Sequence, residues 1–247
     1  MPISPNQGST GGGTTVTITG TNLGGALAVK FGSKLATITA NTATSVTVIS
    51  PSGTGVVDVT VVTLGGVSNP LPFYYVGAPF KSGLSDLSGP TAGGNTVTLT
   101  GVGLSTASAV NFGANAVTPV VLSDSQLSVT VPAGAAAGPV AVSVTTLGGT
   151  NNGLSYTYVD VPTIGAPLPA TGPTSGGTPV TIPGTGLSTT QSVTFDGASA
   201  PFVVVSDTSL TAVTPPGTAG AADVVVTTTG GTVTGAGAFS YVAGPGI

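Results

Sequence analysis

The strongest constraint on the fold is an internal repeat. Phe31-Gly32 recurs as Phe112-Gly113 and as Phe195-Asp196-Gly197, so the copies lie 81 and 83 residues apart. Three prolines keep the same intervals, and each copy closes on a Tyr-Val pair. A unit of this length is the size of a small domain with its own core, since solenoid units have only roughly 20 to 50 residues. The repeat therefore predicts three tandem domains, at residues 1–77, 84–160 and 164–243.

Within each copy, apolar and polar residues alternate with a period of two. The alternation is clearest in 15–20, 96–101 and 178–184, where Val, Ile or Leu alternates mainly with Thr. This pattern is typical of strands with one buried face, and β-branched residues favour a pleated backbone. The Gly-Gly pairs between apolar runs suit hairpins that need positive φ angles. The sequence thus predicts an all-β protein of three tandem immunoglobulin-like Greek-key β-sandwiches, held as a semi-rigid rod by short Pro-containing junctions.

The composition excludes most chemistry. Only 4% of the 247 residues are charged, and the chain has no His and no Cys. Imidazole or thiolate metal sites, thiolate nucleophiles and Ser-His triads are therefore absent, and three Lys cannot neutralise a nucleic-acid backbone. A mean hydropathy of +0.52 argues against disorder. No apolar run reaches the ~18 residues of a membrane span, and no signal peptide is visible at the N-terminus. We expect no enzyme, no cofactor, no metal, no nucleic-acid partner and no membrane insertion.

The order of motifs resembles the IPT/TIG domain. The pattern runs from Pro-x-x-Gly-Gly through a Val-Thr-Ile strand and Val-x-Phe-Gly to a Ser-Val-Thr-Val strand, Gly-Gly and a closing Tyr-Val. In the second copy it is carried by Pro90, Gly93, Gly94, Val97, Leu99, Gly101, Leu104, Val110, Phe112, Gly113, Leu127, Val129, Val131 and Pro132. The first copy departs at Ser9 and 11–13, and the third has Pro183 within its first strand, which indicates an edge strand or a bulge. The resemblance implies an immunoglobulin-like sandwich of the kind found in surface receptors, extracellular bacterial proteins, starch-acting enzymes and some transcription factors.

A carbohydrate site usually needs an exposed aromatic ring on which a sugar can stack, and the chain has twelve aromatic residues. Nine recur at equivalent alternating positions and are expected in the cores, whereas Tyr74, Phe80 and Phe202 have no equivalents. These three are the candidates for a ligand contact or an interdomain contact, and Phe80 falls in the junction 77–83. A carbohydrate-binding module resting on them is the alternative function, with a polysaccharide as partner.

The few charged residues have ordinary structural explanations. Asp124 and Asp207 occupy equivalent loop positions, where a carboxylate usually bonds to the backbone of a turn. Lys30 and Lys34 are expected in solvent, because the other copies have no Lys at the matching sites.

The outward strand positions favour assembly. They carry Thr, Ser, Ala and Asn where charged side chains normally keep sheet edges from pairing. We therefore expect a non-catalytic structural or adhesive repeat protein of a bacterial or phage surface or extracellular assembly. It would act by self-association or by protein–protein contact through exposed β-strands.

Overall fold

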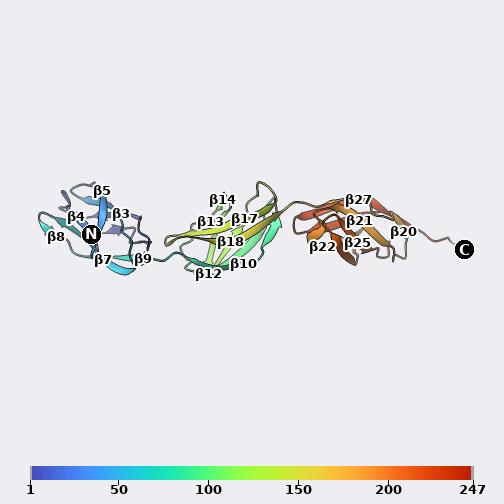
Figure 1. The fold of residues 1–247 in the computed structure, drawn as a ribbon, viewed down its shortest axis with the longest axis horizontal. Helices are drawn as coiled ribbons and strands as arrows, with labels where there is room; N and C mark the ends of the chain where they lie inside the picture. The colour runs from blue at the N-terminus through green and yellow to red at the C-terminus, as the bar shows by residue number, and fades with distance from the viewer. Residues whose placement is uncertain (1, 246–247) are drawn as a thin grey trace. The chain divides into compact units, whose positions relative to one another are not determined.

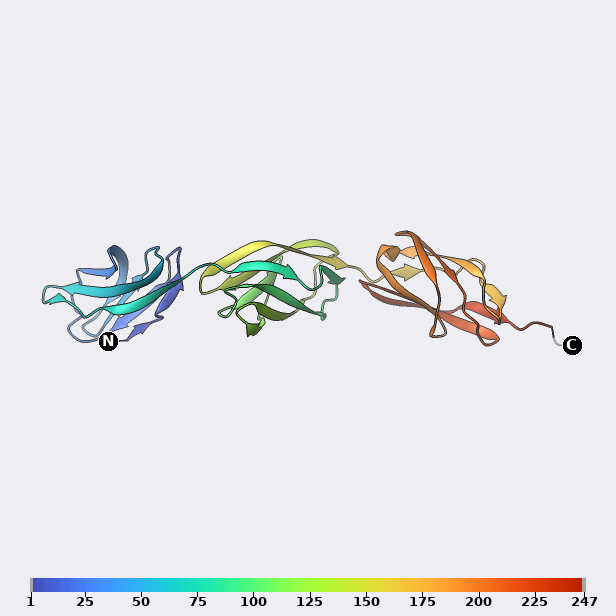
Figure 2. The ribbon, with the colours of Figure 1, turned by 90° about the horizontal axis from the view of Figure 1, so that it is seen from below.

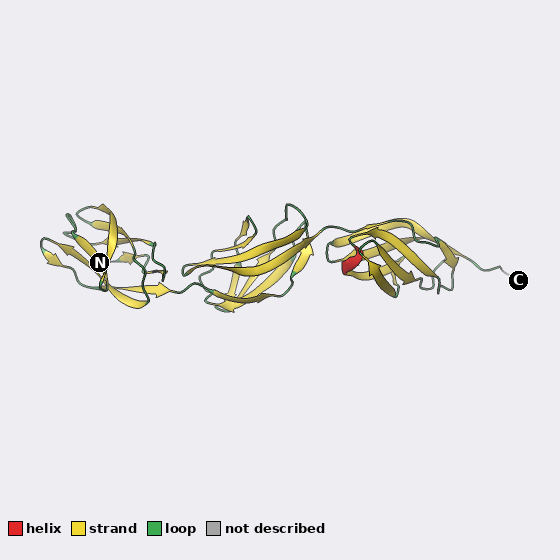
Figure 3. Ribbon diagram, in the orientation of Figure 1, coloured by secondary structure: helices red, strands yellow, loops and turns green. Residues whose placement is uncertain are grey.

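The computed structural model describes residues 2–245, which form three β-sandwiches (Figures 1 and 3). A single turn of 3-10 helix, η1 (Leu187–Thr189), is the only helix within this range. The all-β, immunoglobulin-like prediction is therefore confirmed.

The first sandwich has nine strands whose pairing follows the order β1-β3-β6-β5-β4-β7-β9-β2, with β8 paired to β7. The first half of β5 pairs with β4 and its second half with β6, so this one strand joins both layers. The strands are β1 (Ile3–Ser4), β2 (Gln7–Ser9), β3 (Thr15–Thr19), β4 (Ala28–Phe31), β5 (Lys34–Asn41), β6 (Ser45–Ile49), β7 (Gly55–Thr63), β8 (Gly66–Val67) and β9 (Leu71–Val76).

The second sandwich has two separate sheets, in the orders β10-β12-β16-β15 and β11-β18-β17-β13-β14. Its strands are β10 (Phe80–Leu84), β11 (Ser88–Pro90), β12 (Thr96–Val102), β13 (Ala109–Phe112), β14 (Asn115–Val117), β15 (Val120–Ser123), β16 (Gln126–Thr130), β17 (Gly138–Thr146) and β18 (Gly149–Val159).

The third sandwich repeats this arrangement with the sheets β19-β21-β25-β24 and β20-β27-β26-β22-β23. Its longest hairpin, β26–β27, lies in the orange and red part of the ribbon (Figures 1 and 2). The strands are β19 (Thr163–Ile164), β20 (Thr171–Pro173), β21 (Pro179–Thr185), β22 (Thr190–Phe195), β23 (Ala198–Ser199), β24 (Phe202–Ser206), β25 (Ser209–Val213), β26 (Gly220–Thr228) and β27 (Gly231–Val242).

The cores are built from the inward residues of the alternating pattern. In the first sandwich Phe73 packs edge-to-face between Phe31 and Tyr75, with ring centroids 5.0 and 5.1 Å apart. The third sandwich repeats the arrangement around Phe239. All nine aromatic residues predicted as core are buried: Phe31, Phe73, Tyr75, Phe112, Tyr156, Tyr158, Phe195, Phe239 and Tyr241. Each pair adds about 0.5–1.5 kcal/mol beyond the area it buries.

The closing tyrosine of every copy is bonded to the repeated proline of the same copy. The hydroxyl of Tyr158 donates to the carbonyl oxygen of Pro132 at 2.7 Å, and the equivalent bonds join Tyr75 to Pro51 and Tyr241 to Pro215. This bond explains why the Pro and the Tyr recur at fixed intervals.

Two local expectations differ from the structure. Residues 80–83, expected in a junction, belong to β10, which pairs with β12 of the second sandwich. Pro183, expected in an edge strand or at a bulge, lies in β21, which is not an edge strand because it pairs with both β19 and β25. Next to Pro183, the hydrogen-bonded ladder between β21 and residues 163–168 is interrupted between Ile164 and Leu168. Such a gap is compatible with proline, because proline has no N–H to donate.

Candidate functional site

Two edge strands, β15 and β24, are the main candidate sites. Each is the last strand of its sheet, so one side of its backbone has no neighbouring strand within that sheet. The two strands are equivalent in the repeat, since both begin near the eighth residue after the repeated Phe. A free edge of this kind is a template for pairing with another chain.

Both edge strands expose apolar side chains. Val120 and Leu122 of β15 are 63% and 57% exposed, and Val203 and Val205 of β24 are 65% and 63% exposed. Neither strand contains a charged residue. Natural edges are usually protected by Lys or by inward-pointing charges, and this protection is missing here.

The matching segment of the first sandwich is polar. Residues equivalent to Val120 and Leu122 are Thr39 and Asn41. The Asn41 amide is folded onto its own loop, where Nδ2 donates to the Leu23 carbonyl oxygen at 2.7 Å. The chain thus contains a natural comparison between one polar segment, within β5, and two apolar edge strands.

Prolines account for the separate edge strands. Pro119 lies between β14 and β15, and Pro201 lies between β23 and β24, whereas β5 of the first sandwich runs without a break. Proline cannot donate to a β-ladder and interrupts a strand at that point. Each edge strand also has a register irregularity near its end, between Val121 and Ser123 or between Val204 and Ser206. The regular part of the edge is therefore two residues long in β15 and three residues long in β24.

The acidic residues next to these strands serve their own loops. The Asp124 carboxylate accepts hydrogen bonds from the backbone N–H groups of Gly103 at 3.1 Å and Ser105 at 3.2 Å. Asp207 makes the equivalent bonds in the third sandwich. The side-chain hydrogen bond from Ser105 and these backbone bonds lower the pKa of Asp124. The prediction that both residues bond to turn backbone is confirmed.

The three unmatched aromatic residues do not form a shared platform within one sandwich. Tyr74 is 42% exposed on β9, where its register neighbours are Val56 and Gln7. Phe80 is 66% exposed on β10, opposite Val102. Phe202 is half-buried and packs against the core of the third sandwich. Each sandwich thus carries one of them.

The three lysines lie in different environments. Lys30 and Lys34 are exposed, and Lys34 Nζ donates to the Ser52 carbonyl oxygen at 2.8 Å. Lys81 is buried, and its Nζ donates to the carbonyl oxygens of Asn151 at 3.1 Å and Val142 at 3.3 Å. Burial lowers the pKa of this ammonium group. Sequence reasoning missed its burial, because the strand that carries it was expected to be a junction.

Residues 2–245 contain no group of three or more Asp, Glu, His or Cys side chains that could hold a metal ion. Across the same range, no helix has both the length and the apolar character needed to cross a bilayer.

The fold and its free edges define a class of protein, tandem immunoglobulin-like β-sandwiches. The model of the IPT/TIG domain matches residues 1–75, 79–158 and 162–241. The chain therefore belongs to the IPT/TIG family, as the motifs predicted. No curated protein matches it.

Solved structures with a similar fold include the full extracellular region of plexin A4. That match has a TM-score of 0.51 and 24% sequence identity, and it covers 87% of this chain but 20% of the plexin chain. A crystal structure with a xylogluco-oligosaccharide overlaps with a TM-score of 0.37 and 18% identity, covering 95% of this chain and 58% of that one. The Escherichia coli adhesin FdeC overlaps with a TM-score of 0.35 and 14% identity, covering 97% and 95%. The plexin match supports the fold alone.

Proposed function

We propose that this chain is a non-catalytic structural or adhesive protein of a bacterial or phage surface or extracellular assembly. It binds copies of itself, or another protein, through the exposed edges of β15 and β24. The observation that carries the proposal is the pair of equivalent edge strands with exposed Val and no charge.

Strand addition explains this combination of features. An incoming strand would use the free backbone groups of the edge for hydrogen bonds, while the exposed Val side chains would be covered by the partner. With a net charge of −4 over 247 residues, two copies repel one another weakly. Neither Asp124 nor Asp207 places its charge so as to prevent pairing at the edge, because each carboxylate is hydrogen-bonded to its own loop.

The carbohydrate alternative based on Tyr74, Phe80 and Phe202 receives less support. Stacking on a sugar ring requires an exposed aromatic face, and Phe202 is half-buried against its core. The other two are single exposed aromatic residues on separate sandwiches, and isolated apolar residues are ordinary on protein surfaces.

The test is sedimentation velocity over a wide concentration range, together with negative-stain microscopy. We expect the wild-type chain to form larger species as concentration rises. The double variant Val120→Lys/Val203→Lys should weaken this association by about tenfold or more, since each assembly would bury an unpaired ammonium group. Thr39→Lys, at the equivalent position of the polar segment in β5, is the matched control and should associate like wild type.

Two results would contradict the proposal of self-association through these edges. One is a wild-type chain that stays monomeric at every concentration. The other is a double Lys variant that associates as strongly as the Thr39→Lys control.

A further inference from the structure

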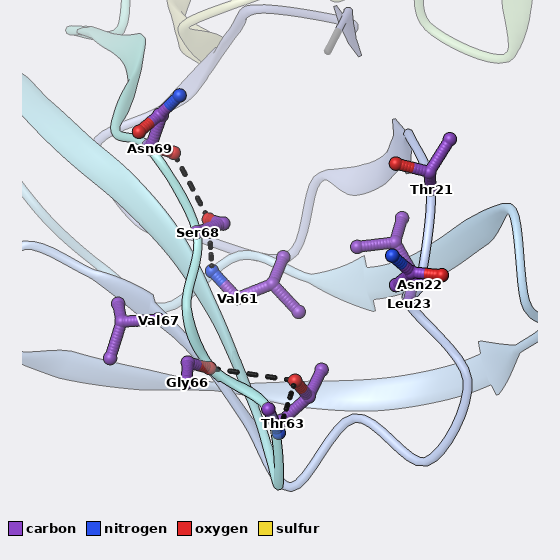
Figure 4. A pocket seen from close by; sticks show the side chains of 10 residues that line it. Thr21, Asn22, Leu23, Val61, Thr63, Gly66, Val67, Ser68 and Asn69 are labelled. Atoms are coloured by element: carbon purple, nitrogen blue, oxygen red, sulfur yellow. Dashed lines mark hydrogen bonds between the residues drawn. The ribbon is translucent and has the colours of Figure 1, made fainter.

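A pocket of the first sandwich lies between a loop and a hairpin (Figure 4). Thr21, Asn22 and Leu23 form one side, and the β7–β8 hairpin with the following residues forms the other. Its volume is about 410 Å³, within the range of pockets that hold small molecules. The pocket is separate from the edge strands β15 and β24, which belong to the other two sandwiches.

The first copy departs from the repeat at the loop that forms this pocket. Asn22 has a positive φ of 57°, a conformation that L-residues rarely adopt. The equivalent residues are Gly103 and Gly186, with φ angles of 75° and 69°. The first copy therefore places an amide side chain where the other copies have none, at a position where glycine would be less strained.

A second departure changes how the loop is held. The residue equivalent to Asp124 and Asp207 is Ala43, so no carboxylate accepts hydrogen bonds from the loop. In the first copy the side chain of Asn41 holds the loop instead, but at another point: Asn41 Oδ1 accepts a hydrogen bond from the Ala26 N–H at 3.1 Å. The carboxylate that binds the N–H of Gly103 in the second copy thus has no counterpart at Asn22.

A third departure forms the opposite wall. In the other copies the last strand continues through the hairpin as β18 or β27, whereas here β8 ends at Val67 and β9 begins at Leu71. Pro70 lies in the break, where it cannot donate to the ladder. Ser68 stabilises the irregular segment, since its hydroxyl accepts from the Val61 N–H at 2.9 Å and donates to the Asn69 carbonyl oxygen (Figure 4).

The pocket is lined by uncharged polar side chains at its rim and by apolar side chains at its base. Leu23 and Val61 are buried, and the pocket has no charged and no aromatic residue in its lining. Among residues 2–245, the side chains of Thr21, Asn22 and Asn69 have no hydrogen-bond partner. Two amides and a hydroxyl offer both donors and acceptors, which suits a ligand that carries several neutral hydroxyl groups.

We infer that the first sandwich has a binding site for one sugar unit of a neutral saccharide, held by the side chains of Thr21, Asn22 and Asn69. The apolar carbon face of the sugar would lie on Leu23 and Val61. Three departures from the repeat, distant in sequence, meet at this one place, and neither strand addition nor core packing requires them. The site uses none of the three exposed or half-buried aromatic residues discussed above.

Amide chemical shifts of the full chain, recorded by NMR during titration, test this inference. The probes are glucose, maltohexaose and cellohexaose, each added to about 10 mM, above the millimolar Kd that a few hydrogen bonds provide. At least one probe should shift the amides of residues 21–23 and 61–69. Asn22→Gly and Asn69→Ala should each raise the Kd about tenfold or more.

Controls separate a binding defect from a folding defect. Asn22→Gly restores the residue of the other two copies and should leave the thermal unfolding of the first sandwich unchanged or raised. Asn152→Ala changes the exposed residue equivalent to Asn69 in the second copy and should bind like wild type. The inference fails if no probe shifts the pocket amides, if the shifts lie elsewhere, or if both pocket variants bind as well as Asn152→Ala.

Discussion

Replacing Gly134 with alanine tests the contact between this glycine and the closing tyrosine of the second copy, Tyr158. Gly134 lies two residues after Pro132, against the ring of Tyr158. A Cβ atom built there would lie 2.8 to 2.9 Å from three atoms of that ring. The ring is only 2% exposed, and its hydroxyl is bonded to Pro132 at 2.7 Å. It can therefore move away only by breaking this bond or by displacing its neighbours.

The expected cost follows from these contacts. Overpacking a filled core costs about 1–3 kcal/mol, and loss of the hydroxyl bond costs about 0.5–1.5 kcal/mol more. The reduced freedom of the unfolded chain with alanine offsets about 0.4–1 kcal/mol. We expect Gly134→Ala to destabilise the second sandwich by about 2 kcal/mol, which lowers the Tm of a domain of this size by about 8–16 °C.

Differential scanning calorimetry of the full chain, with amide exchange to assign the transitions, measures this effect. Only the second sandwich should unfold earlier, because each sandwich has its own core. Gly83→Ala is the matched control in the same sandwich, since the nearest atom to its added Cβ is Thr100 Oγ1 at 3.9 Å. Tyr158→Phe should cost about 1 kcal/mol. In the double variant the freed ring could shift, so the two costs should not add.

The reasoning is refuted if Gly134→Ala costs no more than Gly83→Ala. It also fails if the Gly134→Ala and Tyr158→Phe effects are strictly additive, since the hydroxyl bond would then not hold the ring against the added methyl group.

Two further predictions concern charged side chains. Hydrogen bonds lower the pKa of Asp124 and Asp207 in the folded state, so their stabilising effect is present above the unfolded value of about 3.9 and is lost as pH falls through the lower folded pKa. The stability difference between wild type and Asp124→Asn/Asp207→Asn, measured by urea unfolding, should therefore shrink between about pH 5 and pH 2; a difference independent of pH would contradict this. Lys81→Ala should destabilise the second sandwich by about 2 kcal/mol, because it removes two hydrogen bonds to carbonyl groups and the packing of the aliphatic stem. Lys81→Ile, which copies Ile164 of the third sandwich, should cost clearly less in calorimetry, and an equal loss would show that packing of the stem contributes little.

The sequence was sufficient to predict the cores and the fold class. Inward residues such as Val16 and Val97 alternate with Thr, and a period-two pattern recurs in each copy, so local and tertiary preferences agree. The Asp124 turn was predictable for the same reason, because an Asp that follows a Ser in a loop has few other roles.

Features that depend on distant residues could not be predicted. Phe80–Leu84 contains Lys, Ser and Gly and shows no alternation, so its strand forms only because β12 offers a pairing partner. Pro183 indicated either an edge strand or a bulge; β21 has neighbours on both sides, and the ladder beside Pro183 is irregular between Ile164 and Leu168. The pocket of the first sandwich brings Asn22 and Asn69 together from distant parts of the sequence, and neither residue signals a site alone.

The pairing of the second and last strands in each sandwich has a mechanical consequence. β2 runs parallel to β9, β11 to β18 and β20 to β27. When a chain is pulled at its two ends, parallel neighbours of this kind slide in opposite directions, so their hydrogen bonds are loaded together and not one after another. Each copy should therefore resist tension separately, which would suit the adhesive role proposed above.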